Sequence, residues 1–252
     1  MHRILSKIFE TPERISAGTG RDRDCLRGLA VHIAVMNHVT LRLVLALGLC
    51  ATQPAQAHPH IFIDAGLELI RDGDGRVTEI MVTWRYDELY SLILLEDYGL
   101  DPDFDLSLTE TEVAQTLGFD LNWNSGFEGG LVLRQSGEAL TLGPPEPVRL
   151  TLLDTGQIET THRRPVIGSV ALHPIEAQVY DPEFYIAFEM ILPIAMAGEP
   201  RCEVELIRAD LDAAYAILES ALAEIGGSVA AEDNFPSVGE YFADSAVLTC
   251  PG

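Results

Sequence analysis

The segment His58-Pro59-His60 carries the first residues whose types and spacing could do chemistry. If the segment is extended, its two imidazoles lie on one side of the strand, with Asp64 further along that side. Imidazole nitrogens suit Ni, Co, Zn or Cu better than Ca or Mg. His162 and His173 are the remaining histidines beyond residue 60, and either could complete the set. The sequence therefore predicts a transition-metal site built around His58 and His60.

Pro59 limits the geometry of this predicted site. A square-planar site made from a terminal amine, two amide nitrogens and a histidine needs an N–H at the second residue, and proline has none. A brace remains, formed by the α-amine of His58, its imidazole and the imidazole of His60. Because an α-amine has a pKa of about 7.7–8.0, a metal ion displaces its proton readily. The brace requires that His58 be the first residue of the processed chain.

The residues before His58 are typical of an export signal. The apolar run 41–49 has the length of a signal-peptide core and is shorter than a membrane span. Ala55-Gln56-Ala57 follows as a small-x-small cleavage pattern. We therefore expect a Sec signal over 1–57, with the true start at Met36, and a mature periplasmic domain over 58–252. The mature domain contains no apolar run long enough to span a membrane.

An acidic stretch over residues 101–112 is the second place where chemistry is expected. EF-hand loops place their oxygen ligands at positions 1, 3, 5, 7, 9 and 12. The residues at these positions are Asp101, Asp103, Asp105, Ser107, Thr109 and Glu112. Leu106 departs from the pattern, because position 6 is normally a glycine with a positive φ. A weak calcium site and an acidic helix-capping loop both fit this stretch.

Charge and cysteine content narrow the function classes. The chain has a net charge of −23, and residues 58–252 alone carry about −26, with nine arginines and no lysine. A polyanion of this kind repels nucleic acid and attracts cations. The absence of lysine excludes Schiff-base and P-loop chemistry, and no catalytic motif is found, so we expect no enzyme. Cys202 and Cys250 form an even pair, which predicts a disulfide in an oxidising compartment.

Hydropathy patterns indicate the elements that position these residues. Alternation over 58–70 and 77–86, around the turn Asp72-Gly73-Asp74-Gly75, predicts a hairpin. Helical spacing follows over 87–98 and again over about 112–118, on either side of the acidic stretch. A longer amphipathic helix is expected over 210–225. Further strands are expected at 130–133, 148–153, 166–172, 177–180 and 184–191.

This order of elements predicts an α+β fold. We expect a largely antiparallel sheet or sandwich with an inserted helix–acidic loop–helix and a C-terminal amphipathic helix. The pattern fits one compact unit or two small ones divided near residue 125.

Several short motifs together resemble an uncharacterised bacterial family. They are His58-Pro59-His60-Ile61-Phe62-Ile63-Asp64-Ala65, Val82-Thr83-Trp84, Leu94-Leu95-Glu96-Asp97, Tyr180-Asp181-Pro182-Glu183-Phe184-Tyr185, Phe242-Ala243-Asp244 and Thr249-Cys250. That family is described as a periplasmic component of an ABC-type transport system, and its genes often neighbour nickel/cobalt exporters. The resemblance implies a periplasmic protein whose partner is an inner-membrane transporter or exporter.

Residues and resemblance together predict a periplasmic solute-binding or accessory protein that handles a transition metal through His58 and His60. A mature chain of about 195 residues is small for two lobes that close on a ligand, which favours the accessory role. One alternative is a structural or interaction module that binds Ca²⁺ through the acidic loop. Another is a copper enzyme that uses His58 as a brace.

Overall fold

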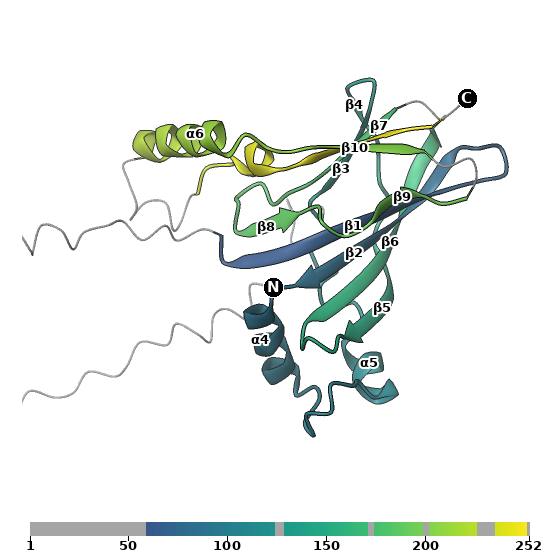
Figure 1. Cartoon of the computed structure of the whole chain (residues 1–252), viewed down its shortest axis with the longest axis vertical. Helices are drawn as coiled ribbons and strands as arrows, with labels where there is room; N and C mark the ends of the chain where they lie inside the picture. Colours follow the sequence, from purple (N-terminus) through teal and green to yellow (C-terminus); the bar gives the residue numbers. More distant parts are fainter. Residues whose placement is uncertain (1–58, 124–128, 171–173, 199–201, 226–234, 251–252) are drawn as a thin grey trace, which may run out of the picture. The chain divides into compact units, whose positions relative to one another are not determined.

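The computed structural model describes residues 59–123, 129–170, 174–198, 202–225 and 235–250. Two β-sheets and three α-helices make up most of this part of the chain (Figure 1). His58 and His173 lie outside the described residues. The predicted α+β class is confirmed, with sheets that are mainly antiparallel.

The first sheet, sheet A, contains the hairpin that follows His60. Its strand order is β5-β6-β2-β1-β8, and β9 also pairs with β1. All its pairs are antiparallel except those of β1 with β8 and β9, which are parallel. The strands are β1 Ile61–Arg71, β2 Val77–Tyr86, β5 Glu146–Leu152, β6 Ile158–Val170, β8 Ile186–Glu189 and β9 Ile194–Met196.

The second sheet, sheet B, is antiparallel throughout, with the order β10-β11-β7-β3-β4. Its strands are β3 Leu131–Gln135, β4 Glu138–Ala139, β7 Ile175–Val179, β10 Glu203–Ile207 and β11 Ser245–Thr249. The chain enters sheet B after residue 130, returns to sheet A for β5 and β6, and then alternates between the sheets.

The β1–β2 hairpin follows the predicted alternation. Asp72 closes its turn, because the Oδ1 atom of this residue accepts hydrogen bonds from the backbone N–H groups of Asp74 at 3.0 Å and Arg76 at 2.8 Å. Ile61 and Ile63 are buried, while Phe62 between them is 49% exposed. Side chains on a strand alternate between its faces, so β1 presents His60, Phe62 and Asp64 to the outer face of sheet A.

One hydrophobic core joins the two sheets. Leu69 and Ile80 of sheet A and Leu133 and Leu248 of sheet B belong to the same buried cluster. Each such side chain contributes about 1.5–3 kcal/mol by leaving water. The described residues before and after position 125 therefore share a core.

The helices begin at polar caps. Asp87 caps α4 (Glu88–Tyr98) by accepting a hydrogen bond from the backbone N–H of Tyr90, and Gly99 ends this helix with a φ of 63°. Helix α5 (Glu110–Thr116) begins two residues before the predicted 112, because Thr109 and Glu112 form a capping box. Asp210 caps α6 (Leu211–Glu224).

Helix α6 packs in a second, smaller hydrophobic cluster. Ala214 and Leu218 contact Phe184 and Phe242, the latter from the 3₁₀-helix η1 (Gly239–Phe242), which lies beside α6 in Figure 1. Leu211, the first residue of this helix, is 53% exposed. No helix among the described residues has both the length and the apolar character needed to cross a membrane.

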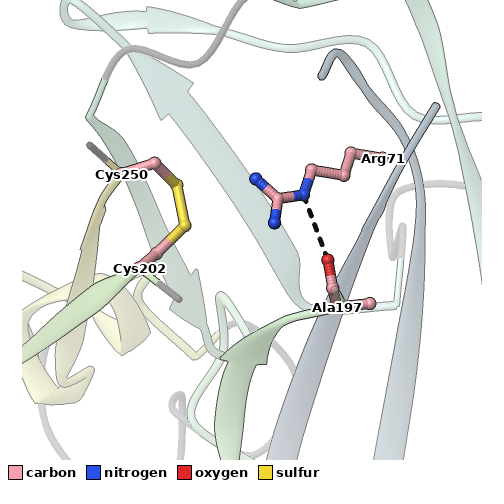
Figure 2. Close-up of a disulfide and its surroundings, with 4 residues drawn as sticks. All are labelled: Arg71, Ala197, Cys202 and Cys250. Carbon is pink, nitrogen blue, oxygen red and sulfur yellow. Dashed lines mark hydrogen bonds between the residues drawn. A yellow bond between two sulfur atoms is a disulfide. The ribbon is translucent and has the colours of Figure 1, made fainter. Parts of the chain in front are cut away.

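The structure contains a disulfide between Cys202 and Cys250, 48 residues apart in sequence (Figure 2). It joins the start of β10 to the end of β11, the strands that pair at one edge of sheet B. Closing a loop of this length contributes about 4 kcal/mol in the chain-entropy description. Figure 2 also shows Arg71, whose Nε donates a hydrogen bond of 3.1 Å to the carbonyl oxygen of Ala197 and so ties β1 to the residue after β9.

Candidate functional site

His60 stands at the head of β1 and is exposed to solvent. Its backbone N–H donates a hydrogen bond of 2.9 Å to the carbonyl oxygen of Tyr185, and the two ring centroids are 4.7 Å apart. The residue just before β8 thus holds both the backbone and the ring of His60. Of the predicted brace, this imidazole is the donor that falls within the described residues.

Asp64 lies on the same face of β1 as His60, as predicted. Burial raises the pKa of its carboxyl; Arg85 opposes that shift, and Glu189 and Glu88 add to it. However, four residues of extended strand separate His60 from Asp64 by about 13 Å, too far for both to ligate one ion. The structure therefore does not bring Asp64 and His60 together around one ion.

His162 belongs to the opposite face of sheet A. It is 1% exposed, sits opposite the buried Val82 on β2, and its ring centroid is 4.8 Å from that of Trp84. Neither ring nitrogen has a hydrogen-bond partner in the described part of the chain. Burial is the main cause, and the charge of Arg164 the second, that together lower the pKa of His162 to about 3. His162 is a neutral core residue and does not join His60 in a metal site.

A buried polar network close to His162 escaped the sequence prediction. Asp120 accepts hydrogen bonds at Oδ2 from the hydroxyl groups of Tyr86, at 3.0 Å, and Thr160, at 2.6 Å. Burial raises the pKa of Asp120, while these two hydrogen bonds oppose the increase. The backbone carbonyl of Asp120 accepts from Nε1 of Trp123 at 2.8 Å. The network holds the segment after α5 against sheet A, which is a structural role.

The acidic loop brings three of its predicted ligands together. Oxygen atoms of Asp101, Asp103 and Asp105 lie within 4.8 Å of one another. Asp101 also accepts hydrogen bonds from the backbone N–H groups of Asp105, at 2.9 Å, and Leu106, at 3.3 Å. Leu106 has a φ of 60°, so it adopts the backbone conformation that glycine normally supplies at position 6.

Glu112 is engaged differently from a calcium ligand at position 12. Its Oε1 accepts from the backbone N–H of Asp101 at 2.8 Å, and its Oε2 accepts from the backbone N–H and the hydroxyl of Thr109 at 2.7 and 2.6 Å. These hydrogen bonds, first those from Thr109, lower the pKa of Glu112. Thr109 is the N-cap of α5, and Ser107 is exposed. The carboxylate thus closes the loop onto its own backbone.

A pocket of about 450 Å³ opens beside Pro59 and β8, and no sequence pattern predicted it. Pro59 from the segment before β1 lines one side, and Leu211 and Tyr215 from α6 line another. Six aromatic residues line it, and we call this cavity the aromatic pocket: Phe62, Tyr180, Phe184, Phe188, Tyr215 and Phe242. Three of the motifs that carry the family resemblance, distant in sequence, therefore meet here.

A tight turn shapes the wall of the aromatic pocket. Asp181 accepts hydrogen bonds from the backbone N–H groups of Glu183, Tyr185 and Ile186, at 3.2, 3.0 and 3.1 Å. Phe184 in this turn has a φ of 52°, which is costly for a bulky residue. Gly239 packs against the turn so closely that a Cβ there would overlap the carbonyl oxygen of Asp181. The wall is thus fixed by backbone contacts on both sides.

Three charged residues line the aromatic pocket, and two of them form an ion pair. Nη1 of Arg208 is 2.6 Å from Oδ2 of Asp244, whose Oδ1 accepts a hydrogen bond of 3.0 Å from the backbone N–H of Ala209. Glu189, the third, is exposed, and its carboxylate makes no hydrogen bond or ion pair with the residues that the structure describes. The net charge at the pocket is therefore negative.

The structure is a two-sheet α+β protein with one pocket shared by several of its sequence motifs. The chain belongs to the family described as "Protein of unknown function (DUF1007)", which matches residues 43–250. No curated protein matches the chain. The predicted resemblance to an uncharacterised family is thereby confirmed.

Proposed function

We propose that the chain is an exported periplasmic protein that binds a transition-metal ion through His58 and His60 and serves as an accessory to a transport system. The observation that carries this proposal is the position of His60. Its imidazole is exposed at the very start of β1, where the processed N-terminus would lie next to it. Tyr185 supports the ring at a centroid distance of 4.7 Å, which reduces the entropy lost when the imidazole binds a metal.

The donor set has three members: the α-amine of His58, its imidazole and the imidazole of His60. Nitrogen donors of this kind suit Ni, Co, Zn or Cu. With His162 in the core and Asp64 about 13 Å along the strand, the ion would keep coordination positions open to water or to a partner. Open positions favour transfer of the ion over its permanent storage, which fits an accessory protein better than a structural metal site.

The surroundings attract cations. Asp64, Glu88 and Glu189 are close enough for the pKa of Asp64 to respond to the other two. Such a cluster on a polyanionic chain raises the local concentration of positive ions. An inner-membrane transporter or exporter of the ABC-transport or nickel/cobalt kind is the partner that the family resemblance suggests.

The test is a calorimetric titration of the processed protein with Ni²⁺, Co²⁺, Zn²⁺ and Cu²⁺. We expect His60→Ala to weaken binding at least tenfold. A variant with one alanine inserted before His58 keeps both imidazoles but displaces the amine, so it should weaken binding comparably. Glu205→Gln, an exposed carboxylate change on β10, serves as the control.

Unchanged affinity in both of the first two variants would exclude the brace. Redox-active bound copper would instead support the alternative of a copper enzyme.

Calcium binding by the acidic loop is a second candidate function, favoured by the three aspartate carboxylates whose oxygens lie within 4.8 Å. With Glu112 engaged in helix capping, we expect a dissociation constant in the range of about 10⁻⁴–10⁻³ M. Calcium at ten times that constant would stabilise the fold by about 1.4 kcal/mol. Thermal unfolding with Ca²⁺ and with EDTA measures this, and Asp103→Asn should abolish the difference. Equal melting in both conditions rules the site out.

A further inference from the structure

We propose that the aromatic pocket binds a small organic cation, such as a compound with a quaternary ammonium group. This inference does not depend on the proposed metal function, because it requires none of the nitrogen donors of His58 and His60; Glu189 is the one side chain that enters both proposals. Its basis is the combination of aromatic walls, an uncompensated carboxylate and a rigid shape in one cavity.

The aromatic pocket has the volume of a small-molecule site. Sites for small molecules usually enclose roughly 300–1,000 Å³, and this pocket, at about 450 Å³, falls in that range. Three of its lining residues, Phe184, Phe188 and Phe242, are each less than 10% exposed. Phe62, 49% exposed, stands at its opening on the outer face of β1. A lining that combines buried residues with a half-exposed one admits a ligand of modest length.

The charged residues that line the aromatic pocket favour a cationic ligand. Arg208 is the only cation that lines this part of the described structure, and Asp244 neutralises it at 2.6 Å. Glu189 has no such partner and contributes a full negative charge at the lining. An anionic ligand would meet Glu189 and would have to break the Arg208 ion pair. A neutral apolar ligand would cover Glu189 without compensating its loss of water.

Aromatic faces complete the recognition chemistry. The π-systems of Phe and Tyr attract a cation within about 6 Å of the ring centroid, and aromatic cages recognise quaternary ammonium groups in this way. Tyr215 meets Phe242 edge to face at 5.0 Å, and Phe184 stacks on Phe242 at 3.9 Å, so three of the lining rings form one cluster. A cation in the pocket would thus lie beside aromatic rings and near a carboxylate.

The wall of the aromatic pocket at Asp181 is rigid. The turn at Asp181 holds Phe184 at a φ of 52°, and Gly239 is packed against the same turn. Residues held in uncommon backbone conformations are found preferentially at binding and active sites. Because this wall is fixed before a ligand arrives, binding costs little ordering of side chains.

The experiment compares acetylcholine with its neutral isostere 3,3-dimethylbutyl acetate as probes, titrated calorimetrically into the processed protein at low ionic strength. The two molecules share size and shape, so any difference in affinity reports the charge. We expect acetylcholine to bind at least tenfold more tightly than the isostere.

Variants assign that preference to residues of the pocket. Glu189→Gln should reduce the affinity for acetylcholine about tenfold and leave the isostere unchanged. Phe62→Leu, at the half-exposed rim, keeps an apolar side chain without a π-face and should weaken acetylcholine binding about threefold. Glu205→Gln on β10 is the control for overall charge and should have no effect. Melting temperatures within a few degrees of the parent protein establish that each variant folds.

Three results would overturn the proposal. Equal affinity for the two probes would show an apolar pocket with no preference for cations. Failure of both probes to bind would show that the cavity takes no ligand of this class. An equal loss in Glu205→Gln and Glu189→Gln would show that acetylcholine responds to net charge and not to the pocket.

Discussion

Two turns in this molecule share the local sequence Asp-Pro-acid-Phe, one at Asp101 and the other at Asp181. In both, the aspartate accepts hydrogen bonds from the backbone N–H groups four and five residues later. In both, the phenylalanine has a positive φ, 57° at Phe104 and 52° at Phe184. The surroundings differ: Phe104 is 86% exposed, whereas Phe184 is 8% exposed and stacks on Phe242.

The comparison separates what the local sequence determines from what the fold determines. The turn conformation arises wherever the aspartate can accept these backbone N–H groups, and the use of the phenylalanine depends on its neighbours. The turn at Asp181 reaches this conformation with Glu183 and Tyr185 at the positions that Asp103 and Asp105 hold in the acidic loop. The curved shape of the acidic loop is therefore a property of the turn, and calcium is not needed to produce it.

The largest expected difference in stability between the two turns follows from removing the phenylalanine ring of each. Phe184→Ala should lower the free energy of unfolding by about 3–5 kcal/mol, because it leaves a cavity beside Phe242. Phe104→Ala should change it by less than about 0.5 kcal/mol, since the ring is in solvent. Urea unfolding of both variants checks this. Similar losses at the two sites would show that Phe104 has a packing role.

Replacing the aspartate of each turn should produce a smaller difference in the free energy of unfolding than replacing the phenylalanine. Asp181 accepts three backbone hydrogen bonds and Asp101 two, so Asp181→Ala should cost about 3 kcal/mol and Asp101→Ala about 2 kcal/mol. Asp→Asn at each site keeps an acceptor oxygen and should restore part of the loss. An Asp101→Ala variant that is fully stable would mean that the acidic loop is held by Glu112 alone.

Comparing glycine with alanine at Phe104 and at Phe184 measures the cost of the positive φ in each turn, apart from the loss of the ring. Because an L-residue at positive φ costs about 1 kcal/mol relative to glycine, Phe104→Gly should be about 1 kcal/mol more stable than Phe104→Ala. The same gap is expected between Phe184→Gly and Phe184→Ala, although both of those variants are destabilised. Unequal gaps in urea unfolding would show that the two turns are under different strain.

The smallest effect concerns pH and Glu112, for which the turn at Asp181 has no equivalent. The folded pKa of Glu112 is lowered, so its contribution to stability is present above the unfolded pKa of about 4.5 and is lost as the pH falls through the lower, folded value. Hydrogen exchange between pH 6 and 3, corrected for intrinsic rates, should show the N–H groups of Asp101 and Thr109 losing protection. Glu112→Gln should remove this dependence, and a dependence that persists would point to another carboxylate.

The sequence predicts the parts of the fold that follow from local rules. The hairpin was readable because side-chain alternation and an Asp-Gly turn agree, and α4 and α6 were readable from the helical spacing of their apolar residues. Strand β6 was predicted only from residue 166, although it begins at Ile158. Its inner face carries Thr160, His162 and Arg164, all buried, and polar residues on both faces conceal the alternation.

The candidate sites differ in the same way: one follows from local sequence, and the other depends on contacts between distant segments. The acidic loop is contiguous, so its aspartates could be identified from spacing alone. The aromatic pocket draws on segments near residues 60, 184 and 242, and no periodicity connects them. The burial of His162 likewise depends on register with Val82 and Trp84 across the sheet, which local spacing does not encode.

The parallel pairing of β1 has a consequence for the order in which the chain can fold. One edge of β1 pairs with β2, which follows it directly in the chain. Its other edge pairs with β8 and β9, which come more than 100 residues later, with Ile61 opposite Ile186 and Leu69 opposite Met196. Contacts between residues so distant in sequence form slowly. A chain that emerges N-terminus first would thus present a half-paired first strand until three quarters of its length had appeared. Such a delay would suit the export that we propose, because a polypeptide that crosses a membrane through the Sec route must stay unfolded until it has passed.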